Sequence, residues 1–137
     1  MKNVTEESNP LLLYVSGLFD GCGCVKIETP KKGERAVLYA WITTKHFSAM
    51  EPLQNLGAHV SKRPDGQYRA KWRDQRAYTL LKRMLPHLRM RKEQAKCGME
   101  FLDNKKRDPQ EDNDNVYKLR LRLLKREEEV IDDEIRI

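Results

Sequence analysis

The stretch LLLYVSGLFDGCGCVKIE, at Leu11–Glu28, constrains the fold more than any other part of the chain. Its first half places apolar residues at helical spacing, and the Asn-Pro pair before it favours a helix start, because proline is tolerated in the first turn. Gly21 and Gly23 are expected to end this helix, and the alternation along Cys24–Thr29 predicts a strand. A helix that passes through a glycine-rich turn into a strand predicts an α+β domain.

Two hairpins and further helices are predicted around this first strand. The turn sequence PKKGE at Pro30–Glu34 separates the first two strands, and Pro-Asp-Gly at 64–66 joins the next two. The remaining core elements are strands at Ala36–Thr44, Ala58–Arg63 and Gln67–Arg73 and helices at His46–Leu56, Gln75–Leu85 and Met90–Leu102. The chain then divides into a tail at 1–9, one core domain at 10–103, a polar linker at 104–115 and a C-terminal helix at 116–137.

Composition narrows the class of protein. Lys and Arg number 27 against 21 Asp and Glu, which gives a net charge of +6, and basic residues are concentrated in Lys62–Arg91. Such a stretch is typical of proteins that bind polyanions, although a solvated surface can be equally basic. No apolar run approaches the roughly 20 residues that span a bilayer, and the N-terminus does not resemble a signal peptide. We therefore expect a soluble intracellular protein, in the cytoplasm, the nucleoid or an organelle, with no membrane partner.

Two segments resemble the LAGLIDADG homing endonucleases. VSGLFDGCG at Val15–Gly23 resembles the signature motif of the family, and LPHLRMRKEQAKCGMEFL at Leu85–Leu102 resembles the run that opens its last core helix. The resemblance implies an α+β fold with an αββαββα core and a saddle-shaped antiparallel sheet, to which this chain adds a C-terminal helix. It also implies that the concave face of the sheet lies in the major groove of double-stranded DNA.

The single copy of the motif has a consequence for assembly. The resemblance implies a homodimer in which the motif helices of two subunits pack against each other. We expect Leu12, Ser16, Gly17 and Phe19 at this interface. Small side chains at positions 16 and 17 allow two helix backbones to approach closely. The same small residues would equally allow close packing within one subunit, and residue type alone leaves both readings open.

Strand periodicity places polar and basic residues on the face that the resemblance assigns to DNA. The set comprises Lys26, Glu28, His59, Ser61, Arg63, Gln67, Arg69, Lys71 and Arg73. Arg and Lys pair with guanine acceptors and Gln with adenine, and the cations also bind phosphates. The alternative reading is an ordinary solvated sheet face.

The strand at Ala36–Thr44 is unusual because it is apolar on both faces. Val37, Tyr39 and Trp41 share one face, and the other holds Ala36, Leu38, Ala40 and Ile42. We expect the second group to lie on the DNA face. There these side chains would touch thymine methyl groups or be covered by a partner.

The resemblance also implies which residues carry the chemistry. In the family the second acid of the motif holds a divalent metal that activates water, but here that position is Cys22. A thiolate is a poor ligand for Mg²⁺, which prefers oxygen. Asp20 is the first acid of the motif, which is usually structural, and a catalytic role for it would require a shift of the turn. Lys45 matches a family position that orients water, and Arg91 matches a basic residue near the scissile phosphate. Both would equally serve as phosphate anchors.

No cofactor is expected, apart from Mg²⁺ if nuclease activity is retained, and no metal ligands are assigned. Three cysteines make no disulfide framework, and no second Cys or His pair has zinc-finger spacing. In the implied dimer two copies of Cys22 would face each other, which suits a disulfide or a shared soft metal, whereas reduced thiols are usual inside cells. Cys97 is expected to be a small packing residue.

These features predict a homodimeric double-stranded DNA-binding protein whose cleavage is weakened or lost because Cys22 replaces the acid. The alternative is an active, metal-dependent, site-specific endonuclease in which Asp20 or another acid holds the metal. Two further classes remain open. One is an intron maturase with RNA as its partner, and the other is a protein-interaction module that uses the apolar residues Leu38 and Ile42.

Overall fold

The structure, a computed structural model, describes residues 9–107 and 111–135. The helices are α1 (Pro10–Cys22), α2 (Met50–Asn55), α3 (Gln75–Met84), α4 (Lys92–Arg107) and α5 (Glu111–Ile135), with single 3-10 turns η2 (Phe47–Ala49) and η3 (Leu85–His87). The strands are β1 (Gly23–Glu28), β2 (Val37–Thr44), β3 (His59–Lys62) and β4 (Tyr68–Arg73). This order agrees with the predicted core, and the predicted tail lies outside the described residues except for its last residue.

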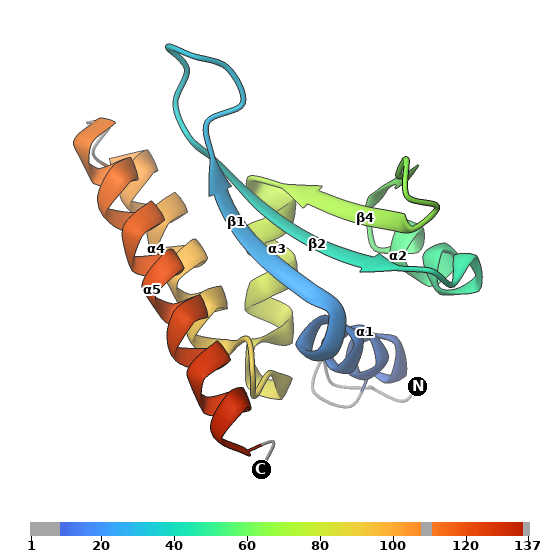
Figure 1. The fold of residues 1–137 in the computed structure, drawn as a ribbon. Helices are drawn as coiled ribbons and strands as arrows, with labels where there is room; N and C mark the ends of the chain where they lie inside the picture. Colours follow the sequence, from blue (N-terminus) through green and yellow to red (C-terminus); the bar gives the residue numbers. More distant parts are fainter. Residues whose placement is uncertain (1–8, 108–110, 136–137) are drawn as a thin grey trace, which may run out of the picture.

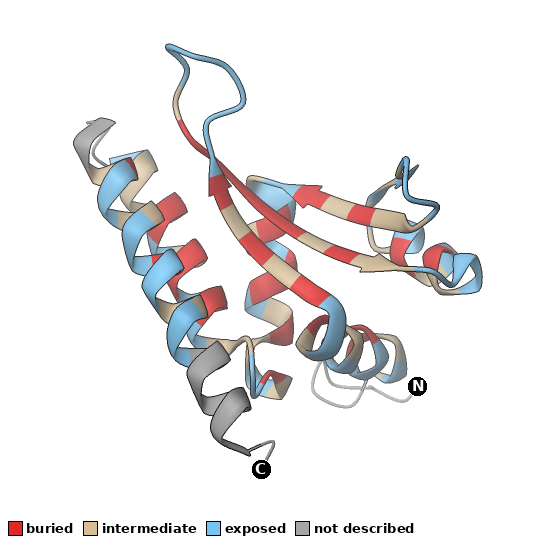
Figure 2. Ribbon diagram, viewed as in Figure 1, coloured by how far each residue is buried: buried red, intermediate tan, exposed pale blue. Residues whose placement is uncertain are grey.

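The strands form one antiparallel sheet in the order β1-β2-β4-β3. Figure 1 shows α3 and α4 on one side of this sheet and α5 running beside α4. The core lies between the sheet and these helices, and Figure 2 shows buried residues along both layers. At Gly98 of α4 a Cβ would lie 2.9 Å from Leu38 Cδ1 and 3.0 Å from Val25 Cγ1, so glycine lets α4 pack directly on the sheet. None of the helices in the described part of the chain has the length and apolar character to cross a membrane.

Helix α1 starts as predicted and ends later than predicted. The Asn9 side chain caps it by accepting hydrogen bonds from the N–H groups of Leu11 and Leu12, at 3.0 and 3.3 Å. The helix continues through Gly21 and ends at Cys22, with Gly23 as its extended C-cap. The expectation that Gly21 breaks the helix is therefore wrong. Glycine makes the free energy of helix formation less favourable, but it does not prevent a helix from forming.

The register of β2 overturns one prediction. Residues directly opposite each other in an antiparallel pair point to the same side of the sheet, and Tyr39 pairs with Lys26 on one side and Arg73 on the other. The face with the polar residues therefore also carries Val37, Tyr39, Trp41 and Thr43. The residues that we placed there, Ala36, Leu38, Ala40 and Ile42, are fully buried in the core. Both sides of this strand are apolar, so hydrophobicity alone could not choose between them.

Most of the segment predicted as a polar linker, 104–115, belongs to helices, and residues 108–110 lie outside the described residues. Helix α4 continues to Arg107, and α5 already begins at Glu111. Asp114 of α5 is buried and accepts hydrogen bonds from Arg35 at 2.8 and 2.9 Å and from the N–H of Ala36 at 3.3 Å. These contacts attach the start of α5 to the start of β2. The predicted C-terminal helix is present as α5, and it packs on α4 and β1.

Candidate nucleic-acid interface

One face of the sheet is basic, and we call it the basic sheet face. The register places on it Lys26 and Glu28 of β1, Tyr39, Trp41 and Thr43 of β2, Arg69, Lys71 and Arg73 of β4, and His59 and Ser61 of β3. The structure thus brings together seven of the nine residues predicted from periodicity. The other two, Arg63 and Gln67, lie in the β3–β4 turn, where the Arg63 N–H donates to the Gln67 carbonyl oxygen at 2.7 Å.

Aromatic rings of β2 hold the cations of β4 in place. The Arg69 guanidinium carbon lies 4.0 Å from the ring centroid of Trp41, and its Nε donates to Thr43 Oγ1 at 3.2 Å. Lys71 Nζ lies 5.0 Å from the ring centroid of Tyr39. Burial, and then the charge of nearby Arg63, lower the pKa of Arg69 below its ordinary value, yet an arginine stays charged at neutral pH. The sheet therefore presents fixed cations whose rotamers are already restricted.

Sequence reasoning missed these aromatic residues because it placed β2 with the wrong side outward. A signal was present, since Tyr and Trp combine an apolar ring with a polar tip and tolerate half-exposed positions. Leu and Ile on the other side of the strand have no polar tip.

Asp20 is a structural residue. Its Oδ2 accepts the N–H of Arg89 at 2.8 Å, and its Oδ1 accepts the N–H groups of Met90 and Arg91 at 3.1 and 3.0 Å. The Nε of Arg91 in turn donates to the Gly23 carbonyl oxygen at 3.1 Å. Asp20 therefore caps the approach to α4 and ties that segment to the end of α1.

The other predicted catalytic residues lie at the same end of the sheet. Gly23 pairs with Ile42, so β1 begins where β2 ends. Cys22 immediately precedes β1 and is exposed, and Lys45, also exposed, immediately follows β2. Arg91 lies beside Gly23. The topology therefore places Cys22, Lys45 and Arg91 at one end of the sheet.

The described residues of a single chain do not fit a Mg²⁺ site. Both carboxylate oxygens of Asp20 are occupied by backbone N–H groups. Within residues 9–107 and 111–135, no three side chains of His, Cys, Asp or Glu come together as metal ligands. The exposed group at the end of α1 is a thiol, which is soft, whereas Mg²⁺ takes hard oxygen ligands.

The cysteines are unpaired within the subunit. Cys24 Sγ accepts a hydrogen bond from Lys125 Nζ of α5 at 3.4 Å. Cys97 is buried, as predicted, and burial raises the pKa of its thiol. The contact between Cys24 and Lys125 was not foreseen, because nothing in the sequence relates positions 24 and 125.

The exposed side of α1 differs from the predicted interface. Leu12, Ser16 and Phe19 are buried within the single chain, so of the four predicted residues only Gly17 is exposed. The exposed side instead carries Leu13, Tyr14, Gly17 and Gly21. The prediction chose apolar and small residues, but the most apolar side of α1 packs on β2 and α3.

A hollow of about 680 Å³ adjoins this exposed side, lined by residues of α1 and of the segment around η3. Two of its lining residues, Ser16 and His87, carry polar atoms that are buried. Among the described residues, Ser16 Oγ and His87 Nε2 have no hydrogen-bond partner. Unpaired buried polar atoms cost free energy, and here both border one hollow.

Solved structures of other proteins are similar to this chain and show which fold it has. No protein-family model and no curated protein sequence matches the chain. Among solved structures, the homing endonuclease I-CvuI in complex with its target matches with a TM-score of 0.72 and 20% identity, over 82% of this chain and 80% of that one. The homing endonuclease I-TnaI matches with a TM-score of 0.58 and 18% identity, over 91% of this chain and 96% of that one.

A third match is the LAGLIDADG meganuclease I-AabMI bound to uncleaved DNA, with a TM-score of 0.56 and 16% identity. It covers 72% of this chain and 38% of that one. The α+β architecture expected from the two motifs is confirmed by these structures and by the antiparallel sheet. The chain has the fold of the LAGLIDADG homing endonucleases.

Proposed function

We propose that this chain is a double-stranded DNA-binding protein that acts as a homodimer and in which DNA cleavage is weak or lost. The basic sheet face supports DNA binding, because four cations from β1 and β4 lie on it with Glu28 as their acidic neighbour. The similar structures of I-CvuI and I-AabMI were solved with DNA, which supports the same assignment.

Arg69 is the residue best placed to read a base. Its Nε is already bonded to Thr43, and its guanidinium plane lies over Trp41, so its two terminal nitrogens remain as a fork. Such a fork matches the O6 and N7 acceptors of guanine in the major groove. Lys71 and Arg73 beside it suit phosphate or guanine contacts. We therefore assign Arg69 to guanine.

The homodimer is proposed to form through the exposed side of α1. A Cβ at Gly17 or Gly21 would meet no atom within 4 Å in the subunit, so close packing inside the subunit does not explain these glycines. They lie four residues apart and share one helix side, where a second α1 could approach closely. A polar group of the second copy entering the adjoining hollow would satisfy Ser16 Oγ and His87 Nε2.

One observation carries the proposal of weak or lost cleavage. The basic sheet face keeps its cations. Asp20, the acid near the end of α1, accepts hydrogen bonds on both carboxylate oxygens from the backbone N–H groups of residues 89–91. Cys22 stands at the motif position that the family resemblance assigns to the metal-binding acid. DNA binding needs only the cations, whereas metal-assisted cleavage needs a hard ligand that this end of the subunit does not supply.

Incubation of the purified protein with a plasmid library and Mg²⁺ or Mn²⁺ tests this proposal. We expect salt-dependent binding to duplex DNA and no specific double-strand breaks. Specific breaks by the wild-type protein would favour the active endonuclease instead. Competition between duplex DNA and structured RNA at matched salt tests the maturase reading, and a preference for RNA would count against the DNA assignment. The protein-interaction reading loses its basis, because Leu38 and Ile42 are buried in the core.

A further inference from the structure

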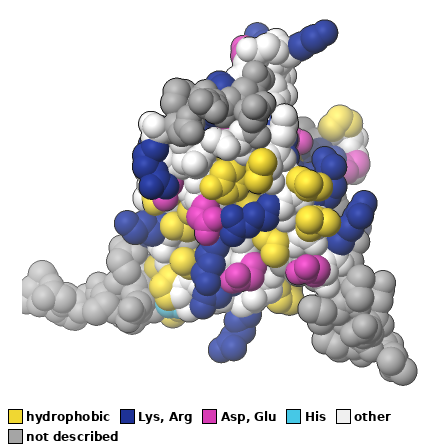
Figure 3. All heavy atoms as spheres, turned by 90° about the vertical axis from the view of Figure 1, so that its left-hand side faces the viewer, with side chains coloured by type: hydrophobic (Ala, Val, Ile, Leu, Met, Phe, Trp, Pro, Cys, Tyr) yellow, Lys and Arg dark blue, Asp and Glu magenta, His cyan; other side chains and the backbone are white. Residues whose placement is uncertain are grey.

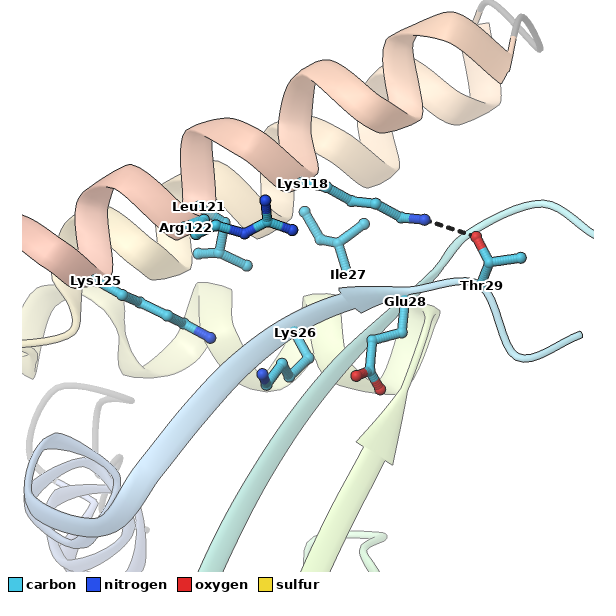
Figure 4. A pocket seen from close by; sticks show the side chains of 8 residues that line it. All are labelled: Lys26, Ile27, Glu28, Thr29, Lys118, Leu121, Arg122 and Lys125. Atoms are coloured by element: carbon cyan, nitrogen blue, oxygen red, sulfur yellow. Dashed lines mark hydrogen bonds between the residues drawn. The ribbon is translucent and has the colours of Figure 1, made fainter.

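A groove between α5 and β1 adjoins the basic sheet face and shares Lys26 and Glu28 with it. It has a volume of about 400 Å³, and its lining contains four basic side chains, Lys26, Lys118, Arg122 and Lys125, and one acidic side chain, Glu28. Figure 4 shows Lys118, Arg122 and Lys125 on the α5 side of the groove and Lys26 and Glu28 on the strand. Figure 3 shows the side of the molecule that includes α5, where Lys and Arg lie among hydrophobic and acidic side chains.

Two contacts set the position of α5 along β1. Lys118 Nζ donates to Thr29 Oγ1 at 2.7 Å, just beyond the end of the strand, and Lys125 Nζ donates to Cys24 Sγ at 3.4 Å near its start. The helix therefore runs antiparallel to the strand. Between these contacts Leu121 and Ile27, both buried, belong to the common core. The spacing of 118, 122 and 125 puts three cations on one side of the helix.

These cations lack acidic partners in the described part of the chain. No ion pair joins Lys26, Lys118, Arg122 or Lys125 to a carboxylate there. Burial lowers the pKa of Lys125 below its ordinary value, and the charges of Lys26 and Arg91 act in the same direction, while Cys24 opposes them. A half-buried ammonium among other cations is unfavourable unless an anion compensates it. The groove thus has the chemistry of an anion site.

Lys26 connects the groove to the surface proposed to bind DNA, and this connection indicates which anion the groove binds. Lys26 belongs to the basic sheet face through its pairing with Tyr39 and also lines the groove, so the two surfaces are continuous. A duplex on the basic sheet face would carry its phosphates past this edge strand. We propose that the α5–β1 groove binds the phosphate backbone of the double-stranded DNA held by the sheet, with Lys118, Arg122 and Lys125 as the contacts from α5. This inference rests on the proposed DNA-binding function.

The salt dependence of duplex binding tests the groove. Each phosphate contact contributes about 0.9 to the slope of log K against log salt concentration. The double variant Lys118→Gln/Arg122→Gln should therefore have a slope shallower by about 1.8 for each subunit, with affinity lower by on the order of tenfold or more near 0.1 M salt. The matched control is Lys82→Gln/Lys96→Gln, which removes two exposed charges from helices on the core side of the sheet and should leave the slope unchanged.

A second variant separates binding from folding. Lys125→Met removes the half-buried ammonium and keeps its length, so the thermal midpoint should stay equal or rise while the slope becomes shallower by about 0.9 for each subunit. A slope equal to the wild-type value in both the double variant and Lys125→Met would overturn the groove assignment alone. Wild-type binding that is insensitive to salt would overturn the proposed DNA-binding function together with it.

Discussion

Arg69 lies stacked on Trp41, with its guanidinium carbon 4.0 Å from the ring centroid, and its Nε is anchored on Thr43 Oγ1 at 3.2 Å. Two residues of β2 thus hold one cation of β4 at the middle of the basic sheet face. An arginine restricted in this way loses less rotamer entropy when it binds a base. In the proposed DNA complex, β2 would therefore support the residue that recognises a base.

Replacement of Trp41 should weaken sequence discrimination more than overall binding. Trp41→Leu releases the Arg69 guanidinium but keeps its charge, so selection for guanine at one position of each half-site should fall by about 1–3 kcal/mol. The salt slope should not change, because no phosphate contact is lost. Binding to a library of duplexes measures both quantities. Trp41→Phe retains a ring and should preserve most of the preference, and an unchanged preference in Trp41→Leu would contradict the role assigned to Arg69.

Substitution at Gly17 should dissociate the proposed dimer without destabilising the single chain. A side chain at Gly17 meets no atom within 4 Å, and leucine is a better helix former than glycine by about 0.8 kcal/mol. Gly17→Leu should therefore keep or raise the thermal midpoint but sediment as a monomer. The control, Lys82→Leu at an exposed position of α3, should remain dimeric. A dimeric Gly17→Leu would show that α1 is not the interface.

A carboxylate at position 22 should restore metal-dependent cleavage. Cys22 is exposed at the end of α1, so Cys22→Asp changes the ligand without disturbing the core. In the proposed dimer it would supply two hard oxygen donors near the axis. We expect nicking or cleavage of a bound duplex with Mg²⁺ or Mn²⁺, read on supercoiled plasmid. Cys22→Ser, which adds no charge, should stay inactive. If Cys22→Asp binds DNA and still does not cut, Cys22 is not what prevents cleavage.

The ion pair between Asp114 and Arg35 should make stability depend on acid pH. Burial opposes the charge on Asp114, but hydrogen bonds from Arg35 and the Ala36 N–H outweigh it and lower its pKa below the ordinary value. A lowered pKa in the folded state stabilises the protein above the unfolded carboxyl pKa of about 3.9. That stabilisation is lost as the pH falls through the folded value.

Urea unfolding of Asp114→Ala measures this contribution. At pH 7 the free energy of unfolding should fall by about 2–3 kcal/mol, less than for a fully buried pair because Arg35 is partly exposed. The difference from the wild-type protein should shrink toward acid pH. Glu100→Ala breaks the exposed pair with Arg120 and should cost no more than about 0.5 kcal/mol. An equal loss for both variants would contradict the structural role of Asp114.

The local signals in the sequence predicted the elements well. The Asn-Pro start of α1, the turn after β1 and the Pro-Asp-Gly turn between β3 and β4 are short-range features, and the structure has helices and strands where they indicate. The alternation of β4 placed Trp72 in the core and Arg69, Lys71 and Arg73 on the opposite face, because only one side of that strand is apolar. The structural role of Asp20 followed from the family resemblance, and its bonds to residues 89–91 agree with that role.

Hydrophobicity did not choose between two apolar sides. Both sides of β2 and much of α1 are apolar, and packing against other elements turns Leu38 and Leu12 inward and leaves Trp41 and Leu13 outward. The contacts of Lys125 with Cys24 and of Asp114 with Arg35 join positions far apart in the chain.

The motif VSGLFDGCG and the two hairpins therefore determined the architecture by themselves, because helix starts, turns and alternation are encoded within a few residues. Only the tertiary structure decided which side of β2 joins the basic sheet face, which side of α1 is exposed, and that α5 and β1 border one groove. Each of these outcomes depends on how distant segments pair and pack, and local periodicity carries no information about that.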